Sequence, residues 1–391
     1  MAINFSDHKA PLLAGTVASV TGQAASTGVV LAAFTALGAT NSQVVSTIFS
    51  MLLLFGTLSI VLSWRYKMPL SIVWSTPGAA MMMASGSLNF GFNNVVGAFI
   101  FAALLIALTG LWPALGKLVF SIPKPIASAM LAGVIFTFCI APFKALPTAP
   151  LIIVPVLVVW LVLYRFATIW ATPVAMVMLF TLSAIQSHVS VPLNQILPTV
   201  EFVSPQFSLA AIVSIGIPLY LVTMASQNIP GIAIMKSFGF EVPFRPVMLA
   251  TGVGSLLATF FGGYLANLAA ITAAINANDH AHKDPSRRWL AAVYGGIVYL
   301  LMAAGTGAMI TFVIQQPREI VLAGAGVALF GTIVGAFTAM VEEDKLKLPA
   351  VIAFLVASSG IALFSVGSAF WALLAGVVVW QAMSLSSKKP V

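Results

Sequence analysis

The chain has 391 residues and a net charge of +8, yet only 7% of its residues are charged and 60% are hydrophobic. Soluble domains contain about 25% charged residues, and a water-soluble protein could not bury this much apolar surface. The composition therefore predicts an integral membrane protein and excludes a water-soluble enzyme, a single-span receptor and a nucleic-acid-binding protein. The basic residues lie singly between apolar runs, which is typical of cytoplasmic loops.

Hydropathy divides the chain into segments that can each cross a membrane, for which about 20 apolar residues suffice. It predicts an all-α polytopic membrane protein of about fourteen segments joined by short loops. The predicted segments are 12–37, 43–63, 70–87, 92–115, 125–141, 149–164, 171–187, 208–228, 246–262, 264–278, 289–314, 319–340, 348–364 and 368–384. The third and tenth are the least regular, because they are short and are interrupted by Pro77 and Asn267.

The basic residues predict which loops face the cytoplasm. If the N-terminus is cytoplasmic, fourteen spans place all 17 Lys and Arg residues on the cytoplasmic side except Lys144 and Arg318. Cytoplasmic loops carry an excess of Lys and Arg. The distribution therefore favours an even number of spans with both termini in the cytoplasm.

The two halves of the chain resemble each other at an offset of 194 residues. Ser75–Gly78 in the third segment then align with Ala269–Thr272 in the tenth, and Pro123 aligns with Pro317, each before a helix. Seven spans per half is an odd number, so the second copy must be inverted in the membrane. Inverted repeats with paired broken helices are typical of secondary transporters, and the breaks indicate the substrate site.

Each irregular segment is predicted to combine a short strand with a short helix. Residues 69–75 are expected to be extended, with Thr76 as N-cap and Pro77 as the first residue of a helix that ends near Gly86. In the tenth segment, residues 264–268 would be extended and 269–276 helical. Two helix N-termini near the membrane middle can bind a carboxylate. A bent helix packed on small residues is the alternative.

Polar side chains at membrane depth are the second indication of a binding site. They include Gln23 in the first segment, Ser226–Asn228 in the eighth, and Asn267 and Thr272 in the tenth. An amide can bind a carboxylate or a neighbouring helix, and both interpretations stay open. No charged residue or His lies at the centre of a predicted span, and we expect no metal and no cofactor. A lipid-modifying enzyme is a weaker alternative, because the one dense acidic run, Glu342–Asp344, is typical of a solvated loop.

These motifs are similar to those of the BenE family of benzoate transporters, which are relatives of the uracil and xanthine permeases. The similarity covers essentially the whole chain. It rests on Ser75–Ala79, Ser226–Gly231, Phe261–Ile275, Asp279–His280 and the turn containing Pro285, Arg287 and Arg288. The third of these stretches is the most specific.

The resemblance implies the two-domain fold of the uracil permeases, in the inner membrane of a bacterium. Spans 1–4 and 8–11 would form a core domain (residues 1–121 and 205–315). Spans 5–7 and 12–14 would form a gate domain (122–204 and 316–391), through which a homodimer would assemble. The permeases hold nucleobases with acidic residues in spans eight and ten, whereas 226–228 and 270–272 contain none here. This departure favours an anionic substrate, which an acid would repel.

The sequence thus predicts uptake of benzoate or a similar small aromatic carboxylate by proton symport, with the core moving against the gate. The expected substrate-binding residues are Gln23, Ser75, Thr76, Pro77, Gly78, Gln227, Asn228, Tyr264, Asn267 and Thr272, with Met81 and Phe261 as further candidates beside the ring. The proton would be carried by Asp279 or His280, or by the substrate itself. A nucleobase-type permease and an uncoupled anion channel or uniporter on the same fold are the alternatives.

Overall fold

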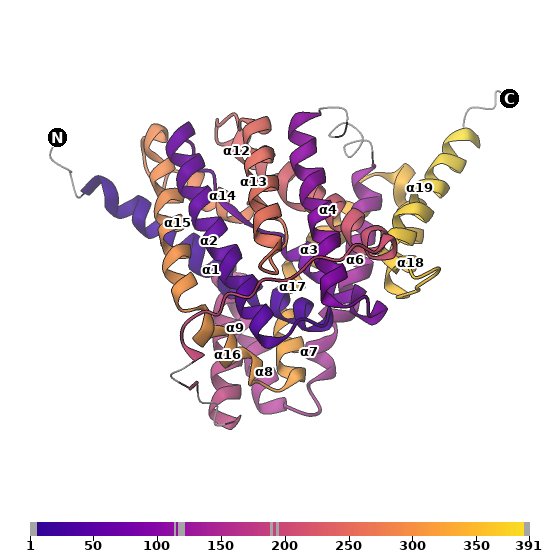
Figure 1. Ribbon diagram of the computed structural model, residues 1–391, viewed down its shortest axis with the longest axis horizontal. Helices are drawn as coiled ribbons and strands as arrows, with labels where there is room; N and C mark the ends of the chain where they lie inside the picture. The colour runs from indigo at the N-terminus through magenta and orange to yellow at the C-terminus, as the bar shows by residue number, and fades with distance from the viewer. Residues whose placement is uncertain (1–5, 113–114, 116–121, 188–190, 193–194, 387–391) are drawn as a thin grey trace.

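Long apolar helices make up most of the computed structural model (Figure 1), which describes residues 6–112, 115, 122–187, 191–192 and 195–386. Seven helices in these ranges are long and apolar enough to cross a membrane. An eighth span arises if α15 (Trp289–Ala304) and α16 (Thr306–Ile314), which meet at a 63° bend, count as one. The chain is therefore a mostly helical, multi-pass membrane protein, and the count of fourteen remains a prediction.

The elements of the first half of the chain lie close to the bounds that the sequence predicts. They are α1 (Ser6–Ala36), α2 (Asn41–Tyr66), β1 (Ile72–Trp74), α3 (Thr76–Ala84), α4 (Phe92–Leu111), α6 (Lys124–Cys139), α7 (Ala141–Lys144), α8 (Pro150–Phe166) and α9 (Thr168–Ser187). Between α3 and α4, η1 (Ser85–Leu88) is a single 3-10 turn.

The second half of the chain is likewise mostly helical. It contains α10 (Leu209–Ala211), α11 (Ile217–Thr223), α12 (Ile229–Ser237), α13 (Phe244–Thr259), β2 (Ala266–Leu268), α14 (Ile271–Ala277), α17 (Arg318–Met340), α18 (Lys347–Ser358) and α19 (Ser368–Ser386). Helices far apart in sequence pack together: α2 lies against α15, α4 against α13, and α6 against both α17 and α18 (Figure 1).

The eighth segment extends to Ser237, so the predicted end at residue 228 is wrong. Two π-helical turns, η3 (Ile212–Gly216) and η4 (Met224–Asn228), precede Pro218 and Pro230 by two residues each. A proline in a regular helix lacks one N–H donor and clashes with the preceding turn. A π turn shifts the hydrogen-bond register by one residue, so the helix continues through both prolines.

The predicted span 348–364 also ends early, at Ser358. Gly360 adopts a φ of +66°, which a continuing helix does not allow, and the chain then turns through Phe364 and Ser365, both with positive φ. Leu363 and Val366 form an isolated bridge across this turn.

The two interruptions form an antiparallel pair of strands. Ile72 pairs with Leu268 and Trp74 pairs with Ala266 in the register. β2 begins 194 residues after β1, which is the offset between the two halves of the chain. Both strands lie where the sequence predicts extended backbone. The helices differ in detail. Ser75, and not Thr76, is the N-cap of α3, and α14 begins after Ala270 because the Ala269 N–H extends the ladder by bonding the Ser71 carbonyl at 2.8 Å.

Serines satisfy the outer edges of this ribbon. A short ribbon at membrane depth exposes N–H groups that lipid cannot bind. Ser59 of α2 accepts from Ile72 N at 2.9 Å, Ser63 from Leu70 N at 3.1 Å, and Ser255 of α13 accepts from Ala266 N at 2.8 Å. The ribbon is thereby fixed between α2 and α13, and its position determines where α3 and α14 begin.

Candidate functional site

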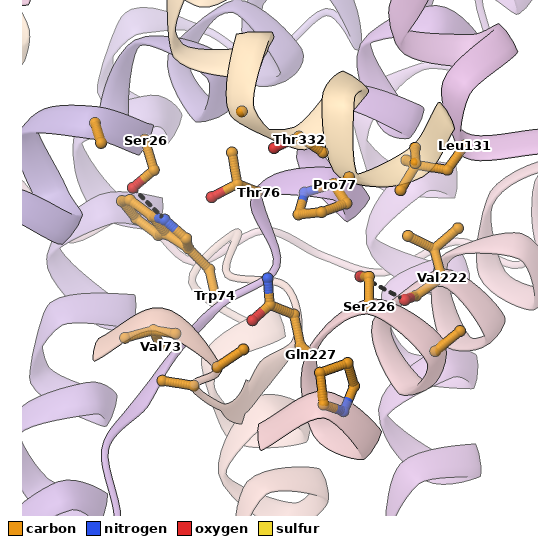
Figure 2. Close-up of a pocket in the computed structure, with 18 of the residues that line it drawn as sticks. Ser26, Val73, Trp74, Thr76, Pro77, Leu131, Val222, Ser226, Gln227 and Thr332 are labelled. Atoms are coloured by element: carbon orange, nitrogen blue, oxygen red, sulfur yellow. Dashed lines mark hydrogen bonds between the residues drawn. The ribbon is translucent and has the colours of Figure 1, made fainter. Parts of the chain in front are cut away.

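A cavity of about 1200 Å³ opens beside the two broken segments. Residues of α1, β1, α3, η4 and α14 line it, together with residues of α6, α8, α9 and α17 (Figure 2). Five of the predicted site residues belong to its wall, namely Gln23, Thr76, Pro77, Gln227 and Thr272. The structure therefore brings side chains from four separate segments to one place.

Two of these side chains are buried and have unpartnered polar atoms. Gln23 is 4% exposed and its Nε2 has no hydrogen-bond partner, and Thr272 is 6% exposed and its Oγ1 has none. α1 and α14 pack closely here, because a Cβ added to Gly22 would stand 3.2 Å from the Thr272 methyl group. Buried polar atoms in proteins are nearly always bonded. A pair of such atoms on a cavity wall therefore indicates a place for a polar ligand.

The π turn η4 gives the cavity a third polar side chain. The Ser226 hydroxyl donates to the Val222 carbonyl at 2.7 Å, so it already has a hydrogen-bond partner within the helix. Gln227 follows in the same turn, and its amide extends into the space near Thr76 (Figure 2). π turns are frequent at functional sites, and here the turn places two consecutive polar residues on the cavity wall.

The N-terminus of α3 offers fewer free N–H groups than the sequence suggests. Ser75 accepts from Gly78 N through its Oγ at 3.0 Å, and its carbonyl accepts from Ala79 N at 2.8 Å. Pro77 has no N–H. Ser75 is fully buried and does not line the cavity. α14 differs, because its N-cap Ala270 makes no side-chain capping bond.

Asn228 and Asn267, both expected at the substrate, bind protein groups instead. Asn228 Nδ2 donates to Asn267 Oδ1 at 3.3 Å, and Asn228 Oδ1 accepts from Leu268 N at 3.0 Å. Asn267 Nδ2 donates to the Leu265 carbonyl at 3.1 Å. Both residues are 0% exposed and lie outside the cavity wall. The hydrogen bonds of these two side chains therefore hold η4 against β2.

The residues expected beside the substrate ring lie elsewhere too. Tyr264 is fully buried behind the ribbon, where its ring packs on Phe34 and stacks on Trp74 at 6.4 Å. Met81 is buried in the hydrophobic core, and Phe261 is partly exposed; neither lines the cavity. Gly78 is packed against Leu219, which a Cβ would meet at 2.8 Å, and is absent from the wall as well.

Trp74 and Ser26 belong to the wall but escaped the sequence analysis. The Trp74 indole donates to Ser26 Oγ at 2.8 Å (Figure 2). Phe55 contacts the same ring edge-on, with the ring centroids 5.4 Å apart. Trp74 thus has a fixed orientation at the end of β1. The signal was present in the sequence, because Trp74 directly precedes the predicted break and an indole N–H at membrane depth needs a partner.

Charged side chains line the cavity only at its exposed end. Among the described lining residues, Lys124 and Glu343 are the charged ones. Lys124 is 68% exposed at its side chain and pairs with Glu342 at 2.7 Å. Tyr164 and Ile169, also exposed, lie in the same wall. The cavity therefore has a charged, open mouth and an uncharged interior.

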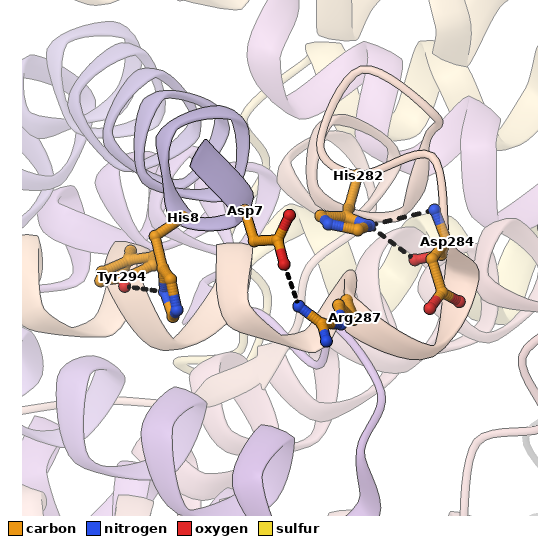
Figure 3. A network of polar contacts seen from close by, with 6 residues as sticks. All are labelled: Asp7, His8, His282, Asp284, Arg287 and Tyr294. Atoms are coloured by element: carbon orange, nitrogen blue, oxygen red, sulfur yellow. Dashed lines mark hydrogen bonds and ion pairs between the residues drawn. The ribbon is translucent and has the colours of Figure 1, made fainter. Parts of the chain in front are cut away.

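Asp279 and His280, the candidates for proton coupling, are exposed in the loop after α14 and do not line the cavity. That loop is anchored nearby by an ion pair between Arg287 and Asp7 at 2.6 Å (Figure 3). Within the loop, Asp284 accepts from Ser286 N at 2.9 Å. The bond to Ser286 lowers the pKa of Asp284 below its usual value. Arg288 donates to the Ala277 carbonyl at 2.7 Å and so caps the end of α14.

No group of three or more His, Cys, Asp or Glu residues that could hold a metal occurs in the described part of the chain. The single cysteine, Cys139, is buried in α6.

Two comparisons with solved structures and curated proteins describe relatives of the chain. It is 36% identical over 384 residues, 97% of each chain, to inner membrane protein YdcO of Escherichia coli (strain K12). It is 33% identical over 325 residues, 82% of each chain, to the benzoate membrane transport protein of Acinetobacter baylyi. The transmembrane domain of a cyanobacterial bicarbonate transporter, BicA, has a similar fold, with a TM-score of 0.62, 16% identity and coverage of 96% of this chain and 98% of that one.

A family profile agrees with these relatives over nearly the full length. The profile described as benzoate membrane transport protein, BenE, matches residues 6–382. The chain is therefore a membrane transport protein and not an enzyme, and it belongs to the BenE family of benzoate membrane transport proteins.

Proposed function

We propose that this protein takes up benzoate or a similar small aromatic carboxylate by proton symport across the inner membrane of a bacterium. One observation carries the proposal: Gln23 and Thr272 line the same cavity, and Gln23 Nε2 and Thr272 Oγ1 are buried without a hydrogen-bond partner. An amide N–H₂ and a hydroxyl can both donate to a carboxylate. Thr76 and Gln227 on the same wall add further donors.

The rest of the cavity suits an aromatic ring. Phe55, Trp74 and Pro77 supply apolar surface on one part of the wall, and small or apolar residues of α6 and α17 supply it on another. No carboxylate stands in the described interior of the cavity, so an anion meets no repulsion there. The apolar surroundings disfavour a nucleobase, whose ring N–H groups require acceptors.

The two-domain mechanism extends this proposal. The residues of α1, α3, η4 and α14 belong to the proposed core, and those of α6, α8, α9 and α17 to the proposed gate. A cavity lined by both supports alternating access by movement of the core against the gate. Lys124, the first residue of α6, and Glu343, in the loop after α17, lie at the open mouth. The charge distribution places both on the cytoplasmic side, so the conformation would be open to the inside. The fourteen spans, the inverted repeat and a dimer through the gate are parts of the same proposal.

The substrate itself is the proton carrier in this scheme. Asp279 and His280 lie outside the cavity, and Glu343 stands at its mouth. A carboxylic acid that enters an uncharged, desolvated site has its pKa raised. The benzoate anion would therefore take up a proton from the outside solution on entering the site and cross the membrane as neutral benzoic acid.

Uptake of labelled benzoate into proteoliposomes, with and without an inside-alkaline pH gradient, tests the proposal. Accumulation that requires the gradient and is not inhibited by uracil or xanthine is expected. Equilibration that ignores the gradient would indicate a uniporter or channel, and inhibition by the nucleobases would indicate a nucleobase permease.

A further inference from the structure

One face of α17 presents small residues to the cavity. Its members are Ala328, Gly331, Thr332, Gly335 and Ala336, which recur at intervals of one helical turn. Thr332 of this face and Thr76 of α3 line the same cavity (Figure 2). The face therefore lies on the proposed gate side of the cavity that Gln23 and Thr272 also line.

Gly331 and Gly335 border empty space. A Cβ built on either residue would have no atom within 4 Å, and both residues are exposed on the cavity wall. Gly324, on the same helix, is different: its Cβ would meet Leu179 at 2.9 Å and Met176 at 3.1 Å. Close packing accounts for Gly324 but not for the other two glycines.

A glycine without a packing reason is unfavourable in a helix. It destabilises a helix interior relative to alanine, because the glycine backbone loses more freedom on folding. α17 carries two such positions, one turn apart, both in the cavity. A ligand that fills the space beside them is a reason for keeping a side chain out.

The cavity is also larger than benzoate needs. Its volume of about 1200 Å³ exceeds the range of about 300–1,000 Å³ typical of sites for drug-sized ligands. Part of this space lies beside α17, where a Cβ on Gly331 or Gly335 would meet no atom within 4 Å. Since Ala328, Ala336 and the two glycines make that space apolar, it suits an uncharged, apolar group.

We propose that Gly331 and Gly335 set the size of the ring that the site accepts, and that the protein binds benzoates carrying an apolar ring substituent as well as benzoate itself. This inference rests on the proposed function, because it requires an aromatic carboxylate at Gln23 and Thr272. It assigns the substituent to the α17 side of the cavity.

A size series tests the assignment. Labelled benzoate uptake is measured in Gly331→Ala, Gly331→Val and Gly335→Val, with 4-methylbenzoate and 4-tert-butylbenzoate as competitors. Val334→Phe is the matched control, because Val334 lies on the same helix, is 54% exposed and does not line the cavity. We expect the parent and the control to bind both competitors. In the valine variants the tert-butyl compound should lose at least tenfold more affinity than benzoate does.

Thiol labelling supplies a readout that does not depend on transport. Because Cys139 is the single native cysteine and is buried, Gly331→Cys and Gly335→Cys can be made in a Cys139→Ser background, with Val334→Cys as control. A water-soluble thiol reagent should modify the two glycine positions faster than position 334. 4-tert-Butylbenzoate should slow that modification more than benzoate does.

The outcomes separate the two proposals. Suppose that the parent takes up benzoate, but the valine variants weaken the binding of benzoate and of both competitors equally, or the two cysteines react no faster than position 334. The proposed role of α17 is then wrong, and the proposed function stands. If the parent neither binds nor takes up any aromatic carboxylate, both proposals fail.

Discussion

Asn228 donates a hydrogen bond to Asn267 at 3.3 Å and accepts one from the backbone of Leu268, so that a single amide joins η4 to β2. The two asparagines are 39 residues apart, and each is 0% exposed. Their amides are saturated by protein groups, whereas Gln23 and Thr272, on the cavity wall, keep unpartnered atoms. The polar side chains at membrane depth thus divide into those that hold the broken segments together and those that are free for a ligand.

Gln23→Leu should weaken benzoate binding by roughly two- to tenfold, because a hydrogen bond to an uncharged group contributes about 0.5–1.5 kcal/mol. Thermal stability of the unliganded protein should not fall, since Gln23 Nε2 has no bond to lose. Competition binding and thermal unfolding in detergent measure the two effects. Gln316→Leu is the control, because Gln316 is buried outside the cavity. Unchanged benzoate affinity in Gln23→Leu would remove Gln23 from the site.

Asn228→Ala should lower the stability of the protein and have little direct effect on benzoate affinity. It leaves the Leu268 N–H and Asn267 Oδ1 buried without a partner, which costs about 1–3 kcal/mol for each unsatisfied group. We expect a lower melting temperature and poor recovery of folded protein. The affinity for benzoate should change only if the loss of these bonds displaces β2. Asn94→Ala, which removes a local bond to the Phe90 carbonyl, serves for comparison. A stable variant that has lost benzoate affinity would show that Asn228 contacts the substrate after all.

Replacing Asp279 by Asn and His280 by Gln together should leave pH-gradient-driven uptake intact, because both residues are exposed outside the cavity. The measurement is labelled benzoate accumulation at a fixed inside-alkaline gradient. Loss of accumulation with retained equilibration would place the proton on this loop. The same loss in Glu343→Gln would place it at the cavity mouth.

Ser214→Ala should shift the balance between conformations. Ser214 Oγ donates to the Ser365 carbonyl at 3.1 Å and accepts from Gly367 N at 3.2 Å, and these bonds join the proposed core to the proposed gate. At about 1 kcal/mol per bond, their loss changes the conformational equilibrium by roughly tenfold or more.

In the alternating-access scheme, the variant should therefore spend less time in the inward-open state. A cysteine at position 331 then reacts more slowly with a thiol reagent applied from the cytoplasmic side. Ser208→Ala is the control, because Ser208 caps α10 in the same segment and bonds Ala211 N. An unchanged labelling rate in Ser214→Ala would mean that these bonds do not hold the inward-open state.

Local chemistry made the breaks predictable. Pro77 restricts the backbone before it, and residues 72–74 contain β-branched and aromatic side chains that favour extended structure, so β1 lies where the sequence places it. The offset of 194 residues then located β2. The same local reasoning misjudged Pro230. A proline ends a helix unless the preceding turn widens, and that widening depends on how η4 packs against its neighbours.

The amino-acid sequence by itself determined that the protein lies in a membrane, where its broken segments occur and which residues could offer amides or hydroxyls at depth, because hydropathy, proline and side-chain chemistry act locally. Only the tertiary structure decided which of those groups are free. Gln23 and Gln227 line a cavity while Asn228 does not, although all three carry the same amide. The difference arises because a hydrogen bond needs a partner within about 3 Å, and that partner comes from a segment distant in the chain.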